Sequence, residues 1–405
     1  MSVVIPPRPA PVKTQTAGYW MRRNLFSGPF NTILTLLSAV LVVWAGYNLI
    51  NFVFIEASWG QVWRNMKLFG AYRYPTEFLW RPLLAIGTML GLMGVMAGAG
   101  GRKSIVGSAF VALQAFVAVV ALIAIVFWPS VRFLWPMVFV LGAIGYGLGS
   151  RWPKSTVKQL PWAWGAWLVF GYLVLAGFTA AGPMTKVPVR DWGGFLLTLI
   201  LFTGIVPSFP LGIALALGRN SKLPAIKYIC IGFIEIVRGA PLIMWLFIAS
   251  LLLPLILNVD ANSLPAIMRA YVAITLFSAA YMAENVRGGL QAVPRGQGEA
   301  ARALGLSAWQ TTLLIVLPQA LRAVIPAIVG QAIGLFKDTS LVFIVGLVDF
   351  FKVGDIVSGQ PEALLITGGV KLETFLFIAS IYFFFAYRMS LASRQLERRL
   401  GVGER

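Results

Sequence analysis

Long runs of apolar residues recur along the whole chain and are separated by short segments that carry most of the charged residues. A run of about 20 apolar residues can cross the hydrocarbon core of a bilayer, which is about 30 Å thick. A transmembrane β-barrel would instead show alternation over segments of about ten residues. We therefore expect an all-α polytopic membrane protein. Its ten predicted spans lie near residues 31–55, 83–100, 105–127, 133–149, 162–182, 193–217, 228–254, 266–284, 322–348 and 373–391.

The basic residues predict the orientation of these spans, because short loops rich in Lys and Arg stay in the cytoplasm. An even number of spans, ten or eight, puts both termini on that side. The basic segment 56–81 breaks the alternation and is expected to lie along the membrane surface. The other clusters fall on every second loop, at Arg22/Arg23, Arg102/Lys103, Arg151/Lys154/Lys158, Arg219/Lys222/Lys227, Arg287/Arg295/Arg302 and Arg388/Arg394/Arg398/Arg399.

Acidic residues divide the chain into two halves. Of the 14 Asp and Glu residues, only Glu56 and Glu77 come before Asp191. The first half carries glycines at four-residue spacing instead, and such small-residue faces let membrane helices approach closely. These glycine pairs are Gly87/Gly91, Gly94/Gly98 and Gly145/Gly149. We therefore expect the first half to be a bundle of packing helices and not to contain a transport path.

The same features predict the order of the domains. We expect a basic, Pro-rich cytoplasmic tail at 1–30, accessory membrane helices at 31–182, a linker at 183–192, a second helical half at 193–395 with a cytoplasmic loop at 285–321, and a cytoplasmic tail at 396–405.

Composition limits the chemistry that the chain can perform. It has no His and one Cys, Cys230, so we expect no metal site, no haem ligated by His and no internal disulfide. The net charge of +19 is spread over short clusters between apolar runs, which favours anchoring among membrane lipids over binding of nucleic acid. The chain also lacks the Gly-rich phosphate loop that ends in Gly-Lys-Ser/Thr.

Paired charges of opposite sign occur in the second half. Residues three positions apart share one face of a helix and can form an ion pair. An unpaired charge inside a bilayer is costly, so two interpretations stay open: a structural salt bridge at a helix end, or a gate or substrate-facing site. The three Glu-x-x-Arg pairs are Glu235/Arg238, Glu284/Arg287 and Glu299/Arg302.

Lys337 and Asp338 interrupt the apolar span at 322–348. Adjacent helical residues point about 100° apart, so these two cannot neutralise each other along one face. A charge in the middle of a span usually faces a bundle interior or a watery cavity, which predicts a site on a translocation path. The alternative is a helix break or a side chain that reaches back to the interface.

The loop at 285–321 contains two helix-like pieces, broken at Pro294 and around Gly305, with Pro318 before the next span. Long ordered loops are usually functional. The piece EAARALGLSAWQ, at 299–310, presents small side chains on one surface, and a short helix of this kind can bind in a groove of another protein. Because the loop is predicted to be cytoplasmic, we expect a cytoplasmic partner.

This loop resembles a known motif. It matches the EAA loop of ABC importer permeases at every defined position, with Glu299-Ala300-Ala301, Gly305 after three residues, and Ile315-x-Leu317-Pro318 after nine more. The stretches GFIEIVRGAPLIMWLF, AAYMAENVRGGLQAVPRGQGEAARALGL and GLFKDTSLVFIVGL look like the polar amino acid subfamily. The longer first half resembles the larger permease of the general L-amino acid transporter.

The resemblance implies a type I ABC importer permease core within 193–395, located in a bacterial inner membrane. In this family two permease subunits form the pathway, two ATPase subunits bind ATP and magnesium and receive the EAA helices, and a periplasmic binding protein delivers the amino acid. The chain itself would hold no cofactor and would not be an enzyme. Because its first half has no second EAA-like repeat, we expect a second permease subunit, identical or sister, and the longer first half favours a sister.

The resemblance also assigns residues. The implied ATPase-coupling residues are Glu299, Ala300, Ala301, Gly305, Leu317 and Pro318. The candidate substrate-path residues are Lys337, Asp338, Glu284, Arg287, Glu235 and Arg238.

An ion-coupled secondary transporter of small solutes is the main alternative, because Glu235, Glu284 and Asp338 could bind protons or sodium. The missing inverted repeat and the coupling loop argue against it. A membrane enzyme is disfavoured by the lack of His and of a recognisable catalytic carboxylate pair. The EAA loop predicts coupling to an ATPase but does not by itself exclude an exporter.

Overall fold

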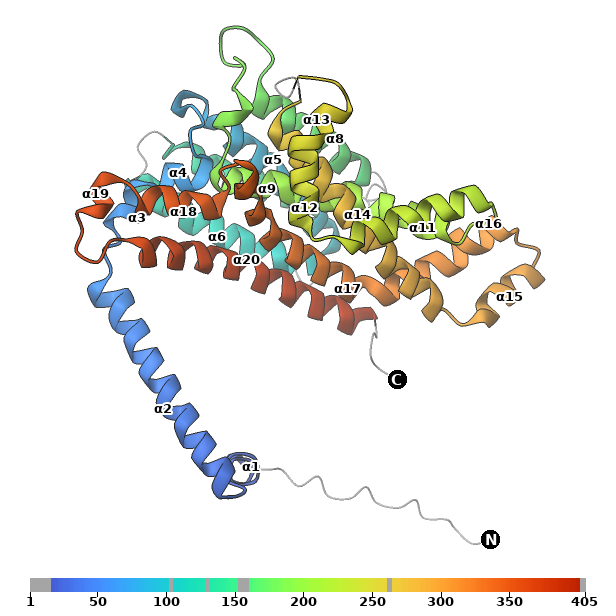
Figure 1. Cartoon of the computed structure of the whole chain (residues 1–405), viewed down its shortest axis with the longest axis horizontal. Helices are drawn as coiled ribbons and strands as arrows, with labels where there is room; N and C mark the ends of the chain where they lie inside the picture. The colour runs from blue at the N-terminus through green and yellow to red at the C-terminus, as the bar shows by residue number, and fades with distance from the viewer. Residues whose placement is uncertain (1–15, 102–104, 128–130, 152–159, 261–263, 401–405) are drawn as a thin grey trace. The chain divides into compact units, whose positions relative to one another are not determined.

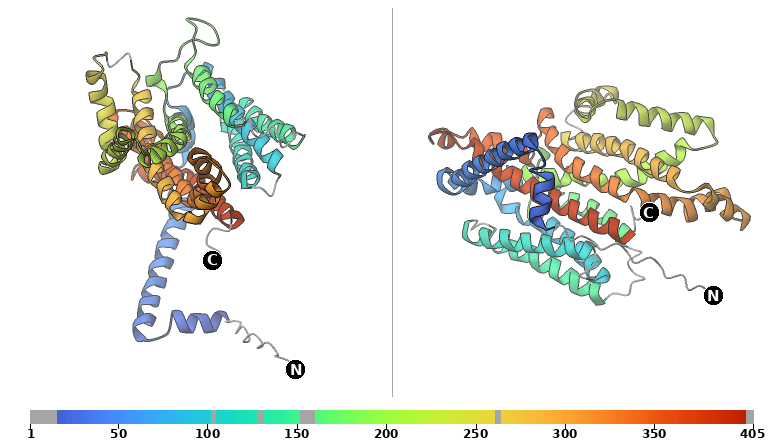
Figure 2. Two further views of the ribbon diagram at one scale, coloured as in Figure 1. Left: turned by 90° about the vertical axis from the view of Figure 1, so that its right-hand side faces the viewer. Right: turned by 90° about the horizontal axis from the view of Figure 1, so that it is seen from below.

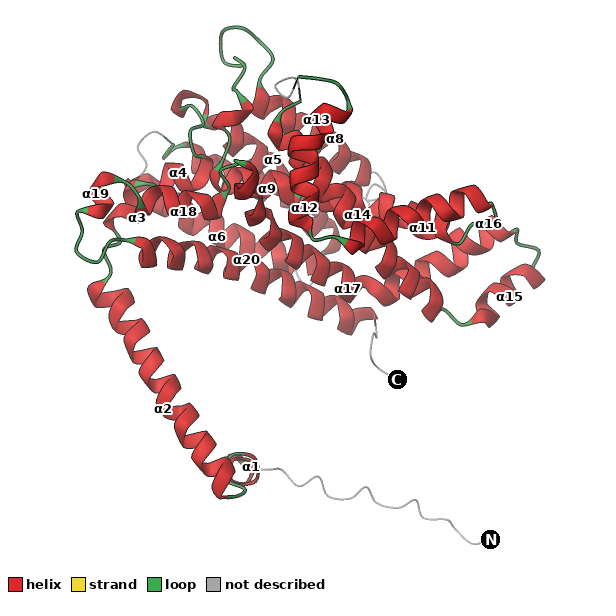
Figure 3. Cartoon of the chain, viewed as in Figure 1, coloured by secondary structure: helices red, strands yellow, loops and turns green. Residues whose placement is uncertain are grey.

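The computed structural model describes residues 16–101, 105–127, 131–151, 160–260 and 264–400. Much of the predicted tails, together with Arg102, Lys103, Lys154 and Lys158, therefore lies outside the described residues. Contacts divide the chain into two units, Met1–Trp59 and Gly60–Arg405. The regular elements in the described residues are helices (Figure 3), which confirms the predicted all-α class.

The first unit contains α1 (Ala17–Asn24) and α2 (Pro29–Asn51), and a π-helical turn at Phe52–Glu56 continues α2. α2 is apolar around its whole circumference and buries none of its residues within the chain. A helix that is apolar on all sides belongs in a hydrophobic environment. Its length and composition are sufficient for a membrane span, as the apolar run at 31–55 predicts.

The accessory part of the second unit has six helices, and its four long helices form a bundle beside the second helical half, as Figure 2 shows. Two short helices come first and are followed by four long ones. They are α3 (Gly60–Arg64), α4 (Met66–Ala71), α5 (Trp80–Gly100), α6 (Ile105–Phe127), α7 (Leu134–Arg151) and α8 (Leu160–Ala176).

α5 and α7 pack through their glycine faces. A Cβ atom added at Gly94 would lie 2.5 Å from the carbonyl oxygen of Gly142, and one added at Gly145 would overlap the carbonyl group of Gly91. Only glycine allows the two backbones to approach this closely, as the small-residue spacing predicts.

We expect Gly145→Ala to destabilise the accessory bundle by roughly 1–3 kcal/mol, because the new methyl group would force α5 and α7 apart. Gly147→Ala is the matched control on the same helix, since nothing lies within 4 Å of a Cβ at that position. Thermal unfolding of the purified chain in detergent would measure both. Equal melting temperatures for the two variants would contradict the close-packing interpretation.

The segment at 56–81 packs against other parts of the protein, and its predicted position along the membrane surface stays a prediction. Asn65 accepts a hydrogen bond from Gln360 at 2.9 Å. Arg81 is fully buried and donates to the carbonyl oxygens of Pro183 and Thr185, at 3.0 Å and 2.8 Å. Because these carbonyl groups accept its hydrogen bonds, the charged Arg81 is tolerated inside the fold.

The second helical half begins with a broken helix and ends with a long one. Its helices are α9 (Gly194–Phe202), α10 (Ile205–Arg219), α11 (Pro224–Gly239), α12 (Leu242–Phe247), α13 (Leu253–Ile256), α14 (Ala266–Ala292), α15 (Arg295–Ala303), α16 (Ala308–Gln310), α17 (Leu317–Asp338), α18 (Phe350–Ser358), α19 (Pro361–Leu364) and α20 (Lys371–Leu400). Short 3-10 helices lie at Val189–Asp191 and Thr339–Val345, and short π-helices lie at Ile248–Leu252 and Thr311–Val316.

The span predicted near 228–254 is broken in the structure, where α11 and the helix Leu242–Ile256 meet at an angle of 106°. Pro241 lies at the bend. A proline lacks the backbone N–H and disfavours helical geometry in the residue before it. That residue is Ala240, whose backbone is extended, with φ −124° and ψ 147°.

Seven of the described helices are long and apolar enough to cross a membrane, and counting the bent pair as one span gives eight. α7 and α8 also match predicted spans but are not among these eight. The structure therefore supports a polytopic protein, with seven or eight candidate spans in the described residues where the sequence predicts ten or eight.

Within the second unit, α15 and α16 lie at the end opposite to α18 and α19, and α20 runs between these two ends (Figure 1). Asp349 is the N-cap of α18. Its buried carboxylate accepts hydrogen bonds from the backbone N–H groups of Phe351 and Lys352, at 2.9 Å and 3.1 Å. Burial raises the pKa of Asp349 to about 6, although both hydrogen bonds favour its charged form.

Candidate functional site

The EAA segment folds as a compact hairpin. α15 folds back toward the helix that runs from Ala308 into α17, and Gln319 Nε2 donates to Gln297 Oε1 at 3.3 Å. Ala301 is the one buried residue of α15, with 4% exposure. Its small side chain lets α15 lie against the supporting helix.

Gly305 reverses the chain between the two arms. Its φ angle of +82° is in the left-handed region, which glycine adopts without strain, and its N–H donates to the carbonyl oxygen of Arg302 at 2.9 Å. Ser307 then caps α16: its Oγ accepts from Gln310 N at 3.3 Å, while Gln310 Oε1 accepts from Ser307 N at 3.0 Å. Both ends of the turn are therefore held by local hydrogen bonds.

The outer surface of this hairpin is exposed and includes large apolar side chains. Leu304 is 84% exposed and Trp309 is 66% exposed, and Glu299 and Ala300 of the same hairpin are also exposed. Exposed apolar side chains grouped in this way mark an interaction surface. The motif alone gave no indication of Trp309, which follows the turn and is not one of its defined positions.

Two of the expected coupling residues face inward. Ala301 is buried against its own hairpin, and Leu317 is 9% exposed within an apolar cluster that includes Met282 and Val286 of α14. Pro318 is exposed in the first turn of α17. These positions shape and anchor the hairpin, whereas Glu299, Ala300 and Gly305 lie on its surface.

The loop predicted at 285–321, with its helix-like pieces, is helical over most of its length. Residues 285–292 still belong to α14, and Ala308–Val345 forms one continuous helical segment. Hydropathy marks where a helix becomes polar, not where it ends, so the helices continue beyond the apolar runs. As a result, the hairpin is joined directly to two membrane helices, which can transmit movement.

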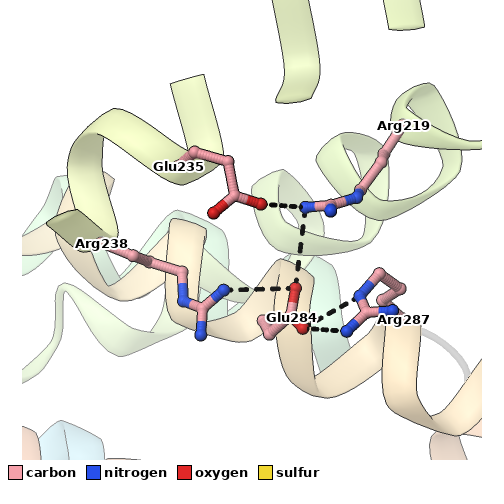
Figure 4. Close-up of polar contacts among 5 residues, drawn as sticks. All are labelled: Arg219, Glu235, Arg238, Glu284 and Arg287. Carbon is pink, nitrogen blue, oxygen red and sulfur yellow. Dashed lines mark hydrogen bonds and ion pairs between the residues drawn. The ribbon is translucent and has the colours of Figure 1, made fainter. Parts of the chain in front are cut away.

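A second feature is a cluster of five charged residues at the ends of α10, α11 and α14 (Figure 4). Glu284 lies at its centre. Its Oε1 accepts from Arg287 Nε at 2.9 Å, and its Oε2 lies 3.3 Å from Arg238 Nη1 and 3.8 Å from Arg219 Nη1. Arg219 also pairs with Glu235 at 2.8 Å. The cluster therefore holds three guanidinium groups and two carboxylates, with one positive charge in excess.

Only part of this arrangement follows from the i, i+3 spacing. The Glu284–Arg287 pair is present, but Glu235 and Arg238 do not pair with each other as expected. They point to partners on neighbouring helices instead: Glu235 pairs with Arg219 of α10, and Arg238 pairs with Glu284 of α14. The spacing within one helix could not reveal Arg219, which is 16 residues before Glu235.

Lys337 and Asp338 occur where α17 changes into the tighter turns of Thr339–Val345. Lys337 is exposed and Asp338 is half-buried, and neither takes part in an ion pair recorded for the described residues. The structure thus places a change of helix type and two charged side chains, neither in a recorded ion pair, inside one candidate span.

Comparison with known proteins identifies the family. A family described as "Binding-protein-dependent transport system inner membrane component" matches residues 208–402. The chain is 40% identical over 429 residues to the glutamate/glutamine/aspartate/asparagine transport system permease protein BztC of Rhodobacter capsulatus, with 98% of this chain and 96% of that protein covered. The chain is a member of the ABC importer permeases. The permease is also 35% identical to the inner membrane amino-acid ABC transporter permease protein YhdY of Escherichia coli, over 98% of this chain and 97% of that one.

Among solved structures, the permease is similar to a chain of an amino acid ABC transporter crystallised with histidines. The identity is 29% over 51% of this chain and 92% of that chain, with a TM-score of 0.45. Family membership makes this chain a multi-pass inner-membrane transport subunit and not an enzyme, with ATP hydrolysis on separate subunits. It therefore favours ATP-driven import over the ion-coupled alternative.

Proposed function

We propose that this permease forms half of the translocation pathway of a polar amino acid importer and is driven by an ATPase that binds the hairpin of α15 and α16. The observation that carries this proposal is the exposed surface of Glu299, Ala300 and Leu304 on a hairpin joined directly to α14 and α17. A docked partner that moves α15 would pull on both helices.

The proposed complex contains a second permease, two ATPase subunits and a periplasmic binding protein. Relatives named for transport of glutamate, glutamine, aspartate and asparagine support an amino acid substrate. A thousandfold gradient requires about 4 kcal/mol, at about 1.4 kcal/mol per tenfold step. One mechanical contact with an ATPase is sufficient to deliver that free energy.

We further propose that the α15 end of the molecule is cytoplasmic, as are both termini. Basic residues support this orientation, because short loops rich in Lys and Arg stay in the cytoplasm. Those at or near helix ends in the predicted cytoplasmic segments include Arg219, Arg295, Arg302 and Arg394. The proposed division into accessory helices at 31–182 and a permease core at 193–395 rests on the separate bundle of α5–α8.

The five-residue charge cluster is proposed to act as a gate that holds α10, α11 and α14 together at the α15 end. Three helices meet there through ion pairs that can exchange partners, since Glu284 lies within 4 Å of all three arginines. Its excess positive charge also suits a substrate carboxylate. Lys337 and Asp338 are proposed to face the pathway above it.

Asp338→Asn is expected to change the apparent substrate affinity or the transport rate by about tenfold, corresponding to about 1.4 kcal/mol, because a charge facing the pathway is removed. ATPase assembly should be unchanged. The matched control is Asp355→Asn, which removes a surface charge paired with Lys352 at 3.3 Å outside the candidate spans. Uptake of labelled amino acids into proteoliposomes measures both, and identical kinetics for Asp338→Asn and wild type would refute the pathway assignment.

The proposal as a whole is tested by purifying the tagged permease in mild detergent and identifying the subunits that accompany it. We expect an ATPase and a second permease, and we expect uptake by the reconstituted complex to require ATP. Accumulation driven by a proton or sodium gradient, without any ATPase, would overturn the proposed mechanism.

A further inference from the structure

A large apolar cavity lies between the accessory helices and the permease core. Its volume is about 860 Å³, and helices α5, α6 and α8 form one wall while α9, α14 and α20 form much of the other. Nearly all of its lining is aliphatic or aromatic. Representative lining residues are Met89, Leu113, Trp164, Ile200, Met268 and Phe385.

Neither vacuum nor water is a stable filling for a cavity of this size. Protein interiors contain few voids larger than one water molecule, and wall atoms without neighbours lose their dispersion contacts. Water in this space would stay in contact with an almost entirely apolar lining, which forfeits the free energy gained when apolar surface leaves water. Hydrocarbon is the filling that a membrane supplies.

Two arginines interrupt the apolar lining. Arg388 Nη2 donates to the carbonyl oxygen of Ser108 at 3.1 Å, and Arg269 Nη1 donates to that of Ser250. The Nε atoms of both are buried and have no hydrogen-bond acceptor among the described residues. Neither guanidinium is paired with a carboxylate there. Such donors suit an anionic ligand, and phosphate is a strong match for guanidinium.

The two arginines lie on different helices of the cavity wall. Arg269 lies in the first turn of α14, whereas Arg388 lies about 25 Å along α20 from Lys371, at about 1.5 Å per residue. Both helices begin far from α15 and run toward its end of the molecule (Figure 1). An amphiphile, with a hydrocarbon chain for the apolar lining and an anionic group for an arginine, fits this combination of residues.

We propose that this cavity binds an anionic phospholipid, with an acyl chain between the accessory bundle and the core and its phosphate at Arg388. Arg388 is preferred to Arg269 because it is only half-buried, beside the exposed Ser108–Gln395 hydrogen bond of 2.8 Å, so a headgroup there can stay hydrated. Arg269 is 9% exposed. Basic pockets between membrane helices bind such headgroups. The lipid fills the seam through which the accessory bundle contacts the core.

The test uses the purified full-length permease, stripped of lipid by detergent exchange, with dioleoyl-phosphatidylglycerol and dioleoyl-phosphatidylcholine as probes. Native mass spectrometry is expected to show retention of phosphatidylglycerol exceeding that of phosphatidylcholine by at least about fivefold, the effect of about one arginine near a phosphate. Arg388→Gln should bring this ratio close to one. Arg394→Gln, an exposed arginine on the same helix, should leave it unchanged.

A second pair of variants tests the acyl-chain site. Ala109 lines the cavity on α6, and Ala115 is exposed on the same helix. Ala109→Phe should reduce retention of both lipids, whereas Ala115→Phe should not. Equal retention by these two variants would overturn the proposal, as would equal retention of the two lipids by wild type.

A measurement on the unaltered chain covers the case in which a variant fails to fold. A phosphatidylglycerol with a photoreactive diazirine in its acyl chain should label cavity-lining residues such as Leu113 and Met389. Labelling confined to outward-facing residues such as Ala115 and Val119 would overturn the proposal.

Discussion

Glu284→Gln is expected to reduce amino acid uptake at least about tenfold, corresponding to about 1.4 kcal/mol or more, and to lower the stability of the permease. Glu284 is the shared acceptor of Arg219, Arg238 and Arg287. Its neutral replacement leaves Arg238 and Arg287 without an acidic partner in a site where Glu284 is only 22% exposed. Removing one member of a buried ion pair costs about 3–5 kcal/mol, and we expect roughly 2–4 kcal/mol at this partly open site.

A double-mutant cycle separates a specific pair from a general loss of charge. Glu284→Gln combined with Arg287→Gln should be less destabilised than the sum of the two single variants, with a coupling energy of about 1 kcal/mol or more. Combining Glu284→Gln with Arg302→Gln, an exposed arginine on α15, should give additive effects. Glu362→Gln, on the surface of α19, controls for the loss of a carboxylate alone.

The readouts are thermal unfolding in detergent and uptake by the reconstituted complex. Wild-type uptake by Glu284→Gln at equal protein levels would show that the charge cluster is dispensable. A large coupling energy together with normal uptake would make the cluster purely structural and would exclude the proposed gate.

Gly305→Val is expected to lower substrate-stimulated ATP hydrolysis and uptake by at least about tenfold while the permease still inserts into the membrane. The physical cause is backbone conformation. Nothing lies within 4 Å of a Cβ at Gly305, so the side chain itself has room, but its φ of +82° is unfavourable for a β-branched residue. The turn should rearrange and move Leu304 and Trp309 away from their present positions.

Gly305→Asn is the control that makes this test specific, because Asn tolerates the left-handed region far better than Val does. It should retain most of the activity although it also adds a side chain to the surface. Co-purification of the ATPase with each variant measures docking directly. If Gly305→Asn and Gly305→Val lose docking equally, the side chain blocks the groove and the conformational explanation is wrong.

Much of the architecture could be predicted because it depends on local properties. Apolar runs of membrane-spanning length specify helices wherever lipid leaves backbone groups no other partner, and predicted runs such as 105–127 and 133–149 agree with α6 and α7 within a few residues. The glycine spacing on α5 likewise predicted close packing. The EAA segment could be located because a turn at Gly305 and small residues on α15 are encoded within a few positions of each other.

By itself, the sequence determined the helical membrane class, the glycine-faced accessory bundle, the hairpin of α15 and its family, because each of these depends on residue types close together in the chain. Only the tertiary structure decided that Arg219 joins Glu235 to Glu284, that Ala240 and Pro241 bend a predicted span by 106°, and that Arg81 is buried on carbonyl oxygens. It also brought α6, α9 and α20 around one cavity. These features depend on contacts between residues far apart in sequence, and the spacing within a single helix carries no information about which neighbour packs against it.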